Sequence, residues 1–313
     1  LNIYFRIRIH GLFFLNFTNS KYIQIKFIFL IKYYSIMVFI FIALSGYAQE
    51  VIKPLIVTAK KGEFFLTWGY NWSWYSNSDI KFEGENYNFE LKNVKAADKQ
   101  TPFTFYNYFH PAHITTPQYN LRLGYYFSDH YSISLGLDHM KYIARSDQSL
   151  QIFGEIQNSG TIYDGVYNDE MILLEEGFLE FEHTDGLNYI NAEVRRFDDL
   201  HTIYKNIKIN LLMGAGLGFI YPKTNAVLLN NERYDQFNFA GYGLHALVGV
   251  GFTFFKHLII QTEFKGGYIN MPNIRTTSNK EDSASQSFFF GQYNFSMGGS
   301  FNLCENKQKK KKQ

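Results

Sequence analysis

The sequence predicts an all-β fold, a transmembrane antiparallel up-and-down barrel of eight strands with long external loops. Three observations lead to this prediction: apolar and polar residues alternate along many segments, aromatic residues are abundant, and short connectors alternate with long ones. Hydrophobic residues reach 46% and aromatic residues 19% of the chain, yet the mean hydropathy is -0.21. A helical membrane protein needs runs of about 20 apolar residues, and after residue 48 there is no such run. Alternation instead divides the apolar content between the two faces of a strand, as in transmembrane barrels.

The first 48 residues have the features of a secretory signal. Lys26 and Lys32 precede an apolar stretch at 33–44, and the small residues Gly46 and Ala48 follow it. A positive flank, a short apolar core and a small-x-small exit are typical of a cleaved signal peptide; an uncleaved anchor is the alternative. We therefore predict an N-terminal extension and signal peptide at 1–48, a periplasmic lead at 49–61, a barrel at 62–303 and a Lys-rich periplasmic tail at 304–313.

The first predicted strand, 62–75, shows the alternation clearly. Its even-numbered residues from Phe64 to Trp74 are apolar or aromatic, whereas Glu63 and Asn71 lie on the other face. Polar groups cannot face hydrocarbon unpaired, so the apolar set is predicted to face lipid and the polar set the lumen. The same division predicts eight strands, at 62–75, 118–127, 131–141, 188–197, 204–221, 238–254, 258–270 and 287–303.

The connectors between these strands support the same architecture. Short turns fall at 128–130, 198–205 and 255–257, and they alternate with long segments at 76–117, 146–187, 222–237 and 271–286. Barrels of this class have short periplasmic turns and long external loops. Within the first long segment, 79–94 also alternates. We expect a hairpin above the membrane there; an extra pair of barrel strands is the alternative.

Assigning the faces gathers four cations, four anions and one histidine in the lumen. The predicted network consists of Glu63, Arg122, Asp138, Glu193, Arg195, Lys208, His245, Glu263 and Lys265. The interior of an eight-stranded barrel is just wide enough for side chains to fill it, so a balanced set predicts a closed, plugged lumen. Arg122 and Asp138 lie on strands joined by a tight turn, and register should place them opposite or diagonal. The alternative is a gated conduit or a small-ligand site.

Glycines recur on the inward faces of two neighbouring predicted strands. We expect them to make room for large side chains from other walls and to permit strong coiling. They are Gly214, Gly216, Gly218, Gly241, Gly243, Gly249 and Gly251.

His139 is the one candidate catalytic residue. By parity it faces lipid near the external end of its strand, where a polar side chain is costly. A histidine beside a serine could activate the hydroxyl for chemistry on lipopolysaccharide acyl chains. No serine falls beside His139, however, and Asn188 is the nearest outward polar residue. The alternative is an interfacial histidine that contacts lipid headgroups.

Few features indicate a metal, a cofactor or nucleic acid. Cys304 is the sole cysteine, and His110 and His113 would need further ligands to hold a metal. The segment 146–184 has nine acidic residues and no Lys or Arg. We expect it to be a solvated external loop; a Ca²⁺ or Mg²⁺ site, which carboxylate oxygens would suit, is the alternative. Without residues 1–48 the chain has 25 basic against 28 acidic residues, which argues against nucleic acid. We predict no metal and no cofactor.

The pattern over 62–303 resembles the small outer-membrane barrel families of the OmpA, OmpX and OmpW kind. The resemblance rests on strand pattern rather than on a signature motif. It implies an outer-membrane location and insertion by the barrel-assembly machinery, with the last strand, ending Phe301-Asn302-Leu303, as the signal for insertion. Those families commonly end at a terminal Phe, whereas ten residues follow Leu303 here.

Together these features predict an outer-membrane barrel with a structural or surface-interaction role. Its expected partners are outer-membrane lipid and lipopolysaccharide, with an unidentified ligand for the loops. Two alternatives stay open: an enzyme that modifies lipopolysaccharide acyl chains around His139, and a narrow channel or carrier for small molecules.

Overall fold

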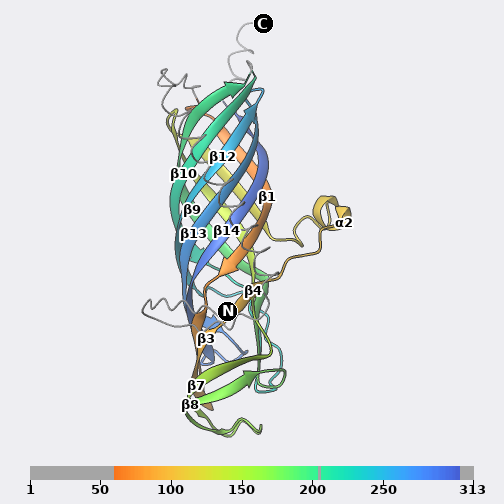
Figure 1. Cartoon of the computed structure of the whole chain (residues 1–313), viewed down its shortest axis with the longest axis vertical. Helices are drawn as coiled ribbons and strands as arrows, with labels where there is room; N and C mark the ends of the chain where they lie inside the picture. Colours follow the sequence, from red (N-terminus) through yellow and green to blue (C-terminus); the bar gives the residue numbers. More distant parts are fainter. Residues whose placement is uncertain (1–59, 204–205, 304–313) are drawn as a thin grey trace, which may run out of the picture. The chain divides into compact units, whose positions relative to one another are not determined.

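Eight strands close into a ring in the computed structural model, which describes residues 60–203 and 206–303 (Figure 1). Each strand pairs antiparallel with its neighbours, and pairing of the first with the last closes the ring. The strands are β1 (Phe64–Tyr75), β5 (Tyr119–Tyr126), β6 (Tyr131–Ala144), β9 (Leu179–Ile203), β10 (Ile207–Ile220), β12 (Gly241–Phe254), β13 (Leu258–Arg275) and β14 (Ser283–Phe301). The predicted all-β, eight-stranded antiparallel barrel is confirmed.

Each predicted strand corresponds to one ring strand, and the main differences are in length. β9, predicted at 188–197, extends over 25 residues. β6, β13 and β14 also continue past their predicted ends, on the side away from Lys60 and Leu303. The predicted signal peptide, most of the lead and the tail with Cys304 lie outside the described residues.

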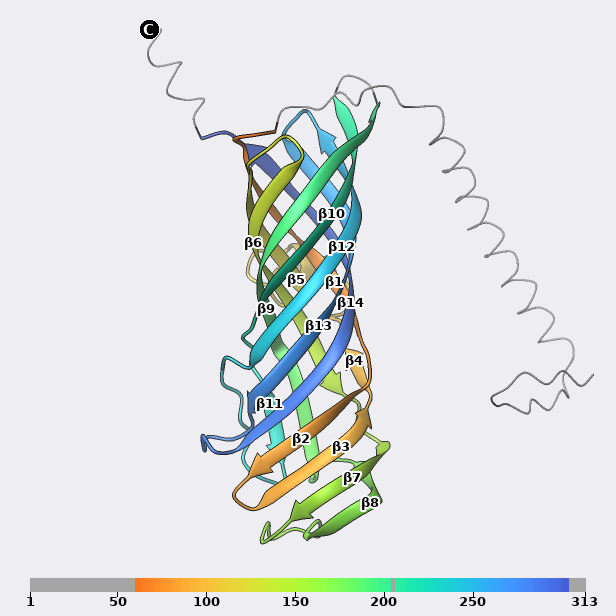
Figure 2. The ribbon, with the colours of Figure 1, turned by 90° about the vertical axis from the view of Figure 1, so that its left-hand side faces the viewer.

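Six further strands continue the sheet beyond one end of the ring (Figure 2). β2 pairs with the start of β14, and β3 pairs with β7, so the sheet runs β14-β2-β3-β7-β8. We call these strands, with the adjoining ends of β6, β9, β13 and β14, the projection. The six strands are β2 (Ser78–Gly84), β3 (Tyr87–Val94), β4 (Ala96–Asp98), β7 (Gln148–Ile156), β8 (Gly165–Leu174) and β11 (Asn225–Leu228).

The structure of the projection tests the predictions made for two segments, 79–94 and 146–184. The hairpin expected at 79–94 is present as β2 and β3, and neither strand enters the ring. The acidic segment 146–184 was expected as a solvated loop, and this expectation is wrong. It forms β7, β8 and the start of β9, because its apolar residues alternate with the acidic ones and pack inward.

The described helix is short. α2 (Phe105–Phe109) begins at Thr104, whose hydroxyl accepts a 3.1 Å hydrogen bond from the Asn107 backbone N–H, as an N-cap does. In the part of the chain that the structure describes, no helix has the length and apolar character needed to cross a membrane.

The polarity of the two strand faces reverses where the ring meets the projection. On β6 the inward residues change from Ser134 and Asp138 to Met140 and Tyr142, all buried. The outward face changes in the opposite sense, from leucines to Lys141. Buried apolar residues past the same change on β9, β13 and β14 include Leu187, Ile269 and Phe290.

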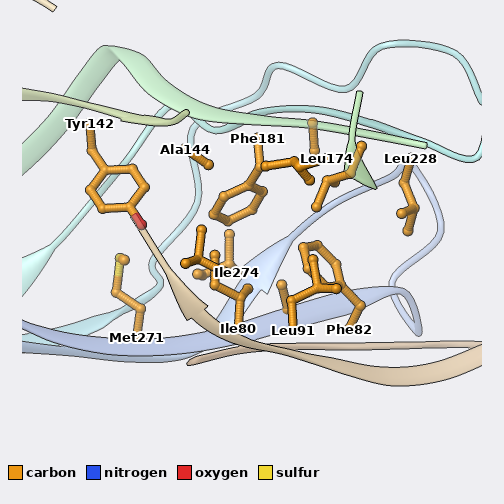
Figure 3. Close-up of a cluster of buried hydrophobic side chains, with 14 of the residues drawn as sticks. Ile80, Phe82, Leu91, Tyr142, Ala144, Leu174, Phe181, Leu228, Met271 and Ile274 are labelled. Carbon is orange, nitrogen blue, oxygen red and sulfur yellow. The ribbon is translucent and has the colours of Figure 1, made fainter. Parts of the chain in front are cut away.

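Two apolar clusters lie at the two ends of the ring interior. The terminal cluster, at the end where Lys60 and Leu303 lie, consists of Phe65, Tyr126, Phe197, Leu212 and Ile259. The projection has a much larger core, built from both added hairpins and the extended ring strands. Figure 3 shows its side chains meeting in one interior, with the rings of Phe82 and Phe181 5.6 Å apart. The projection is therefore a packed domain and not a set of loops.

Candidate functional site

Seven of the nine predicted lumen residues come together between the two apolar clusters. They project from five ring strands, and each is at most 6% exposed. We call them the charge cluster: Arg122, Asp138, Glu193, Arg195, His245, Glu263 and Lys265. Three cations face three anions, so the charges balance when His245 is neutral.

Glu193 is the centre of the charge cluster. Its carboxylate lies 2.5 Å from Arg195 Nε and 2.7 Å from Arg122 Nη2. Lys265 Nζ and His245 Nε2 each lie 2.9 Å away. One carboxylate thus connects four side chains from four different strands.

The other two carboxylates extend the network. Asp138 lies 2.5 Å from Lys265 Nζ and 3.7 Å from Arg122 Nη2, and register places Arg122 diagonal to it, as expected. Glu263 receives both terminal nitrogens of Arg195, at 2.9 and 3.2 Å. A two-point Arg–carboxylate contact is strong and fixes geometry.

Amide and phenol side chains satisfy the remaining positions around the charges. Asn191 donates to Asp138 at 3.0 Å, and Asn294 donates to Glu263 at 3.1 Å. The Tyr189 hydroxyl lies 2.8 Å from His245 Nδ1. The charge-based prediction did not include these residues, although inward parity alone would have found them. Buried charges need such partners, since an unpaired one is very costly.

Inward glycines make room for this cluster. A Cβ on Gly136 would stand 2.5 Å from the Arg122 guanidinium carbon, and one on Gly216 would stand 2.7 Å from both Glu193 and His245. Gly251 differs, because its nearest neighbour would be 3.6 Å away. The expected role of the glycines therefore holds for Gly216 but not for every inward glycine.

Glu63 and Lys208 do not join the charge cluster. Lys208 Nζ lies 3.2 Å from Asp199, and Asp199, Glu63 and Lys208 all interact electrostatically with Lys60 near the terminal end. The prediction is wrong for these two residues because parity gives the face of a residue but not its height. The terminal cluster separates their level from that of Glu193.

The arrangement encloses the polar lumen. The charge cluster is covered toward Lys60 and Leu303 by the terminal cluster and toward the projection by the projection core. Each charged side chain of the cluster forms an ion pair with an oppositely charged side chain of the cluster. Chemically, these ion pairs hold the strands of the ring together.

His139 faces outward but is covered. Its ring stacks on Tyr119 at 4.9 Å, Tyr119 stacks on Trp68 at 4.6 Å, and the side chain is only 8% exposed. His139 Nδ1 lies 2.8 Å from Asn188 Oδ1. Within residues 60–203 and 206–303, no Ser or Thr hydroxyl is hydrogen-bonded to this ring.

The histidine pair of the first long segment is not part of a metal site in the described chain. The rings of His110 and His113 lie 5.4 Å apart just after α2, and Tyr106 packs against both. Over the described ranges, no group of three or more His, Cys, Asp or Glu side chains is placed to hold a metal ion.

Comparison with known proteins finds similarity at the level of structure alone. No protein-family model matches the chain, and no curated protein matches it significantly. The attachment invasion locus protein Ail of Yersinia pestis is similar, with a TM-score of 0.31 and 12% identity over 77% of this chain and 99% of Ail. OprG of Pseudomonas aeruginosa has a TM-score of 0.36 and 10% identity over 79% of this chain and 100% of OprG.

A third similar structure is the N-terminal β-barrel domain of Pseudomonas aeruginosa OprF. Its TM-score is 0.27, with 8% identity over 76% of this chain and 99% of that domain. Similarity at this level says nothing of what the chain does. Of these three, OprG is described as an outer membrane protein and the OprF domain as a β-barrel.

Proposed function

We propose that this chain is an outer-membrane barrel with a closed lumen, and that its role is structural or interactive and is carried by the projection. One observation carries the proposal: the reversal of face polarity between ring and projection. In the ring, apolar side chains point out and polar ones point in; in the projection the order is opposite. Lipid around the ring and water around the projection would each favour the face that meets them.

The outward face of the ring supports a lipid environment. Leu66, Leu135 and Leu217 are 47%, 68% and 69% exposed, and large exposed apolar surfaces mark contact with a partner or a membrane. On β1 the outward apolar series spans Phe64 to Trp74. At about 3.3 Å per residue and a strand tilt near 40°, this series covers about 25 Å, the height of the apolar band of such barrels.

The partners follow from this placement. Outer-membrane lipid and lipopolysaccharide would surround the band, and the barrel-assembly machinery would recognise the aromatic last strand. The projection would meet partners outside the cell. The enzyme alternative loses support because His139 pairs with Asn188 and no hydroxyl of the described residues is hydrogen-bonded to its ring. The channel alternative loses support because both ends of the lumen are filled.

Site-specific labelling of whole cells tests the orientation. In a Cys304→Ser background, cysteine is placed at Ile162, which is 91% exposed next to β8, or at the exposed Thr202 near the opposite end of the ring. A membrane-impermeant maleimide should label Ile162→Cys on intact cells and Thr202→Cys only after lysis. Equal labelling of both sites in intact cells would rule out the proposed orientation.

Conductance in planar bilayers tests the closed lumen. The wild-type protein should be silent, and so should Phe65→Ala, because the charge cluster and the projection core still fill the lumen. Discrete conductance steps by the wild-type protein would show an open path and favour the channel alternative.

A further inference from the structure

A groove of about 570 Å³ opens on the outer wall of the barrel where β4 lies beside β1. One wall is aromatic, made by Trp72 and Trp74 of β1 and Tyr293 of β14. The polar part of the lining, which we call the polar wall, is made by Asp98, Gln100 and Arg145. The groove is separate from the charge cluster, which lies inside the ring.

The groove exists because the strand ladder is interrupted there. β1 pairs with β5 only as far as Tyr70, although β1 continues to Tyr75. β4 occupies the place next to β6, with Asp98 paired to Tyr142. The Asp98 carboxylate accepts a 2.9 Å hydrogen bond from the Ser73 backbone N–H. A side-chain contact thus replaces the ladder and leaves space outside it.

The polar side chains of the groove include one carboxylate, Asp98, and one cation, Arg145. The Asp98 carboxylate is occupied by three donors, the Ser73 N–H and the side chains of Gln100 and Gln118. The Arg145 guanidinium, in contrast, is exposed and has no hydrogen bond or ion pair with any described residue. An anionic group would find an available partner in Arg145, whose planar fork suits phosphate.

The aromatic wall belongs to the lipid-facing band. Trp72 and Tyr293 are cross-strand neighbours with rings 5.8 Å apart, and Trp74 is 57% exposed. They end the outward apolar series of β1 next to the projection. Tryptophan and tyrosine favour such a boundary because each combines an apolar body with a polar tip. The groove is therefore continuous with the surface that contacts acyl chains.

We propose that this groove binds one lipopolysaccharide molecule of the outer leaflet, with a lipid A acyl chain along the aromatic wall and a lipid A phosphate at Arg145. The proposal rests on the orientation given under Proposed function, since only that orientation puts the groove in the outer leaflet. The aromatic wall is continuous with the lipid-facing band, which suits an acyl chain. The Arg145 guanidinium suits a phosphate group.

Native mass spectrometry of the detergent-solubilised full chain tests the site, with purified hexa-acylated lipid A as the probe. We expect one lipid A to bind the wild-type protein, and Arg145→Gln to weaken that binding about tenfold by removing a charge-assisted contact. Lys280→Gln is the matched control, because Lys280 is also exposed and has no ion pair with a described residue but lies away from the groove. Trp72→Ala should also weaken the binding of lipid A, because it removes part of the aromatic wall while leaving every charge of the groove in place.

Several outcomes would overturn the site. These are equal loss of binding in Arg145→Gln and Lys280→Gln, no loss in Arg145→Gln, no bound lipid A at all, or equal affinity for lipid A and phosphatidylglycerol. Fluorescence separates this failure from that of the proposed function. The three tryptophans, Trp68, Trp72 and Trp74, all lie on β1, so bilayer lipids with brominated acyl chains should quench them whenever the barrel is inserted. Quenching without lipid A binding would reject the groove alone; no quenching would reject the membrane barrel.

Discussion

Gly136 of β6 lies directly opposite Arg122 of β5, and a Cβ on Gly136 would stand 2.5 Å from the guanidinium carbon. The guanidinium cannot move away freely. It is held by Glu193 at 2.7 Å, Asn191 at 3.0 Å and the Ser134 hydroxyl at 3.2 Å. The missing side chain at Gly136 is thus a condition for the charge cluster.

Gly136→Ala should lower the free energy of unfolding by about 1–3 kcal/mol, since the added methyl group forces Arg122 off at least one buried partner. Urea titration of the barrel in lipid vesicles measures this. Gly251→Ala is the control, because its Cβ would meet only an ordinary contact at 3.6 Å. Equal effects of the two substitutions would show that strand propensity, and not the position of Arg122, decides the result.

Arg195 and Glu263 should be strongly coupled in stability. Removing Arg195 with Arg195→Met leaves Glu263 with the Asn294 amide as its remaining hydrogen-bond partner among the described residues. Breaking a buried ion pair typically costs about 3–5 kcal/mol. Adding Glu263→Gln removes the stranded charge and should recover part of the loss. A double-mutant cycle of unfolding free energies measures the coupling. Additive effects of the two substitutions would contradict the observed bidentate pair.

The strands of the ring could be predicted from the sequence because a strand between lipid and lumen has two faces of opposite polarity. Parity therefore placed Arg122, Asp138 and Glu193 inward, where the structure has them. Parity could not give height along the barrel. For this reason Glu63 and Lys208 were grouped with residues from which the terminal cluster separates them.

The projection was harder to predict for a related physical reason. Its strands have the reverse pattern, with apolar side chains inside and polar ones outside, as in a water-soluble sheet. The prediction of a solvated loop took account of Glu180 and Glu182. It did not take account of Leu179 and Phe181, which alternate with them and are buried. The outer groove depends on pairing between β4 and β6, which are far apart in sequence, and alternation carries no information about that.

His183 should make the projection sensitive to acid. It lies in the projecting part of β9, fully buried, with its Nδ1 3.0 Å from the Thr224 hydroxyl. Burial lowers the pKa of His183 from 6.5 to about 3. The unfolded chain therefore takes up a proton more readily than the folded chain, and stability is lost as the pH falls from about 6.5 toward 3.

When the pH falls from 7 to 4.5, protonation of His183 in the unfolded chain should lower the unfolding free energy of the projection by roughly 2–3 kcal/mol. Limited proteolysis of the membrane-inserted protein at the two pH values measures local opening of the projection. His183→Gln should remove most of the acid-induced increase in cleavage, whereas His110→Gln, at an exposed position, should leave it unchanged. Identical acid sensitivity in wild-type protein and His183→Gln would assign the effect to the carboxylates instead.

His139 is expected to stabilise the outer wall and to perform no chemistry. Its ring stacks on Tyr119 and binds Asn188, and it has no hydroxyl partner to activate in the described chain. Mass spectrometry of lipid A should therefore find the same number of acyl chains in cells with wild-type protein, with His139→Ala and without the protein. His139→Ala should instead lose about 1–2 kcal/mol of unfolding free energy through the lost stacking and hydrogen bond. An acyl chain gained or lost with the wild-type protein, but not with His139→Ala, would establish the enzyme alternative, because only a reaction that needs the imidazole would produce that difference.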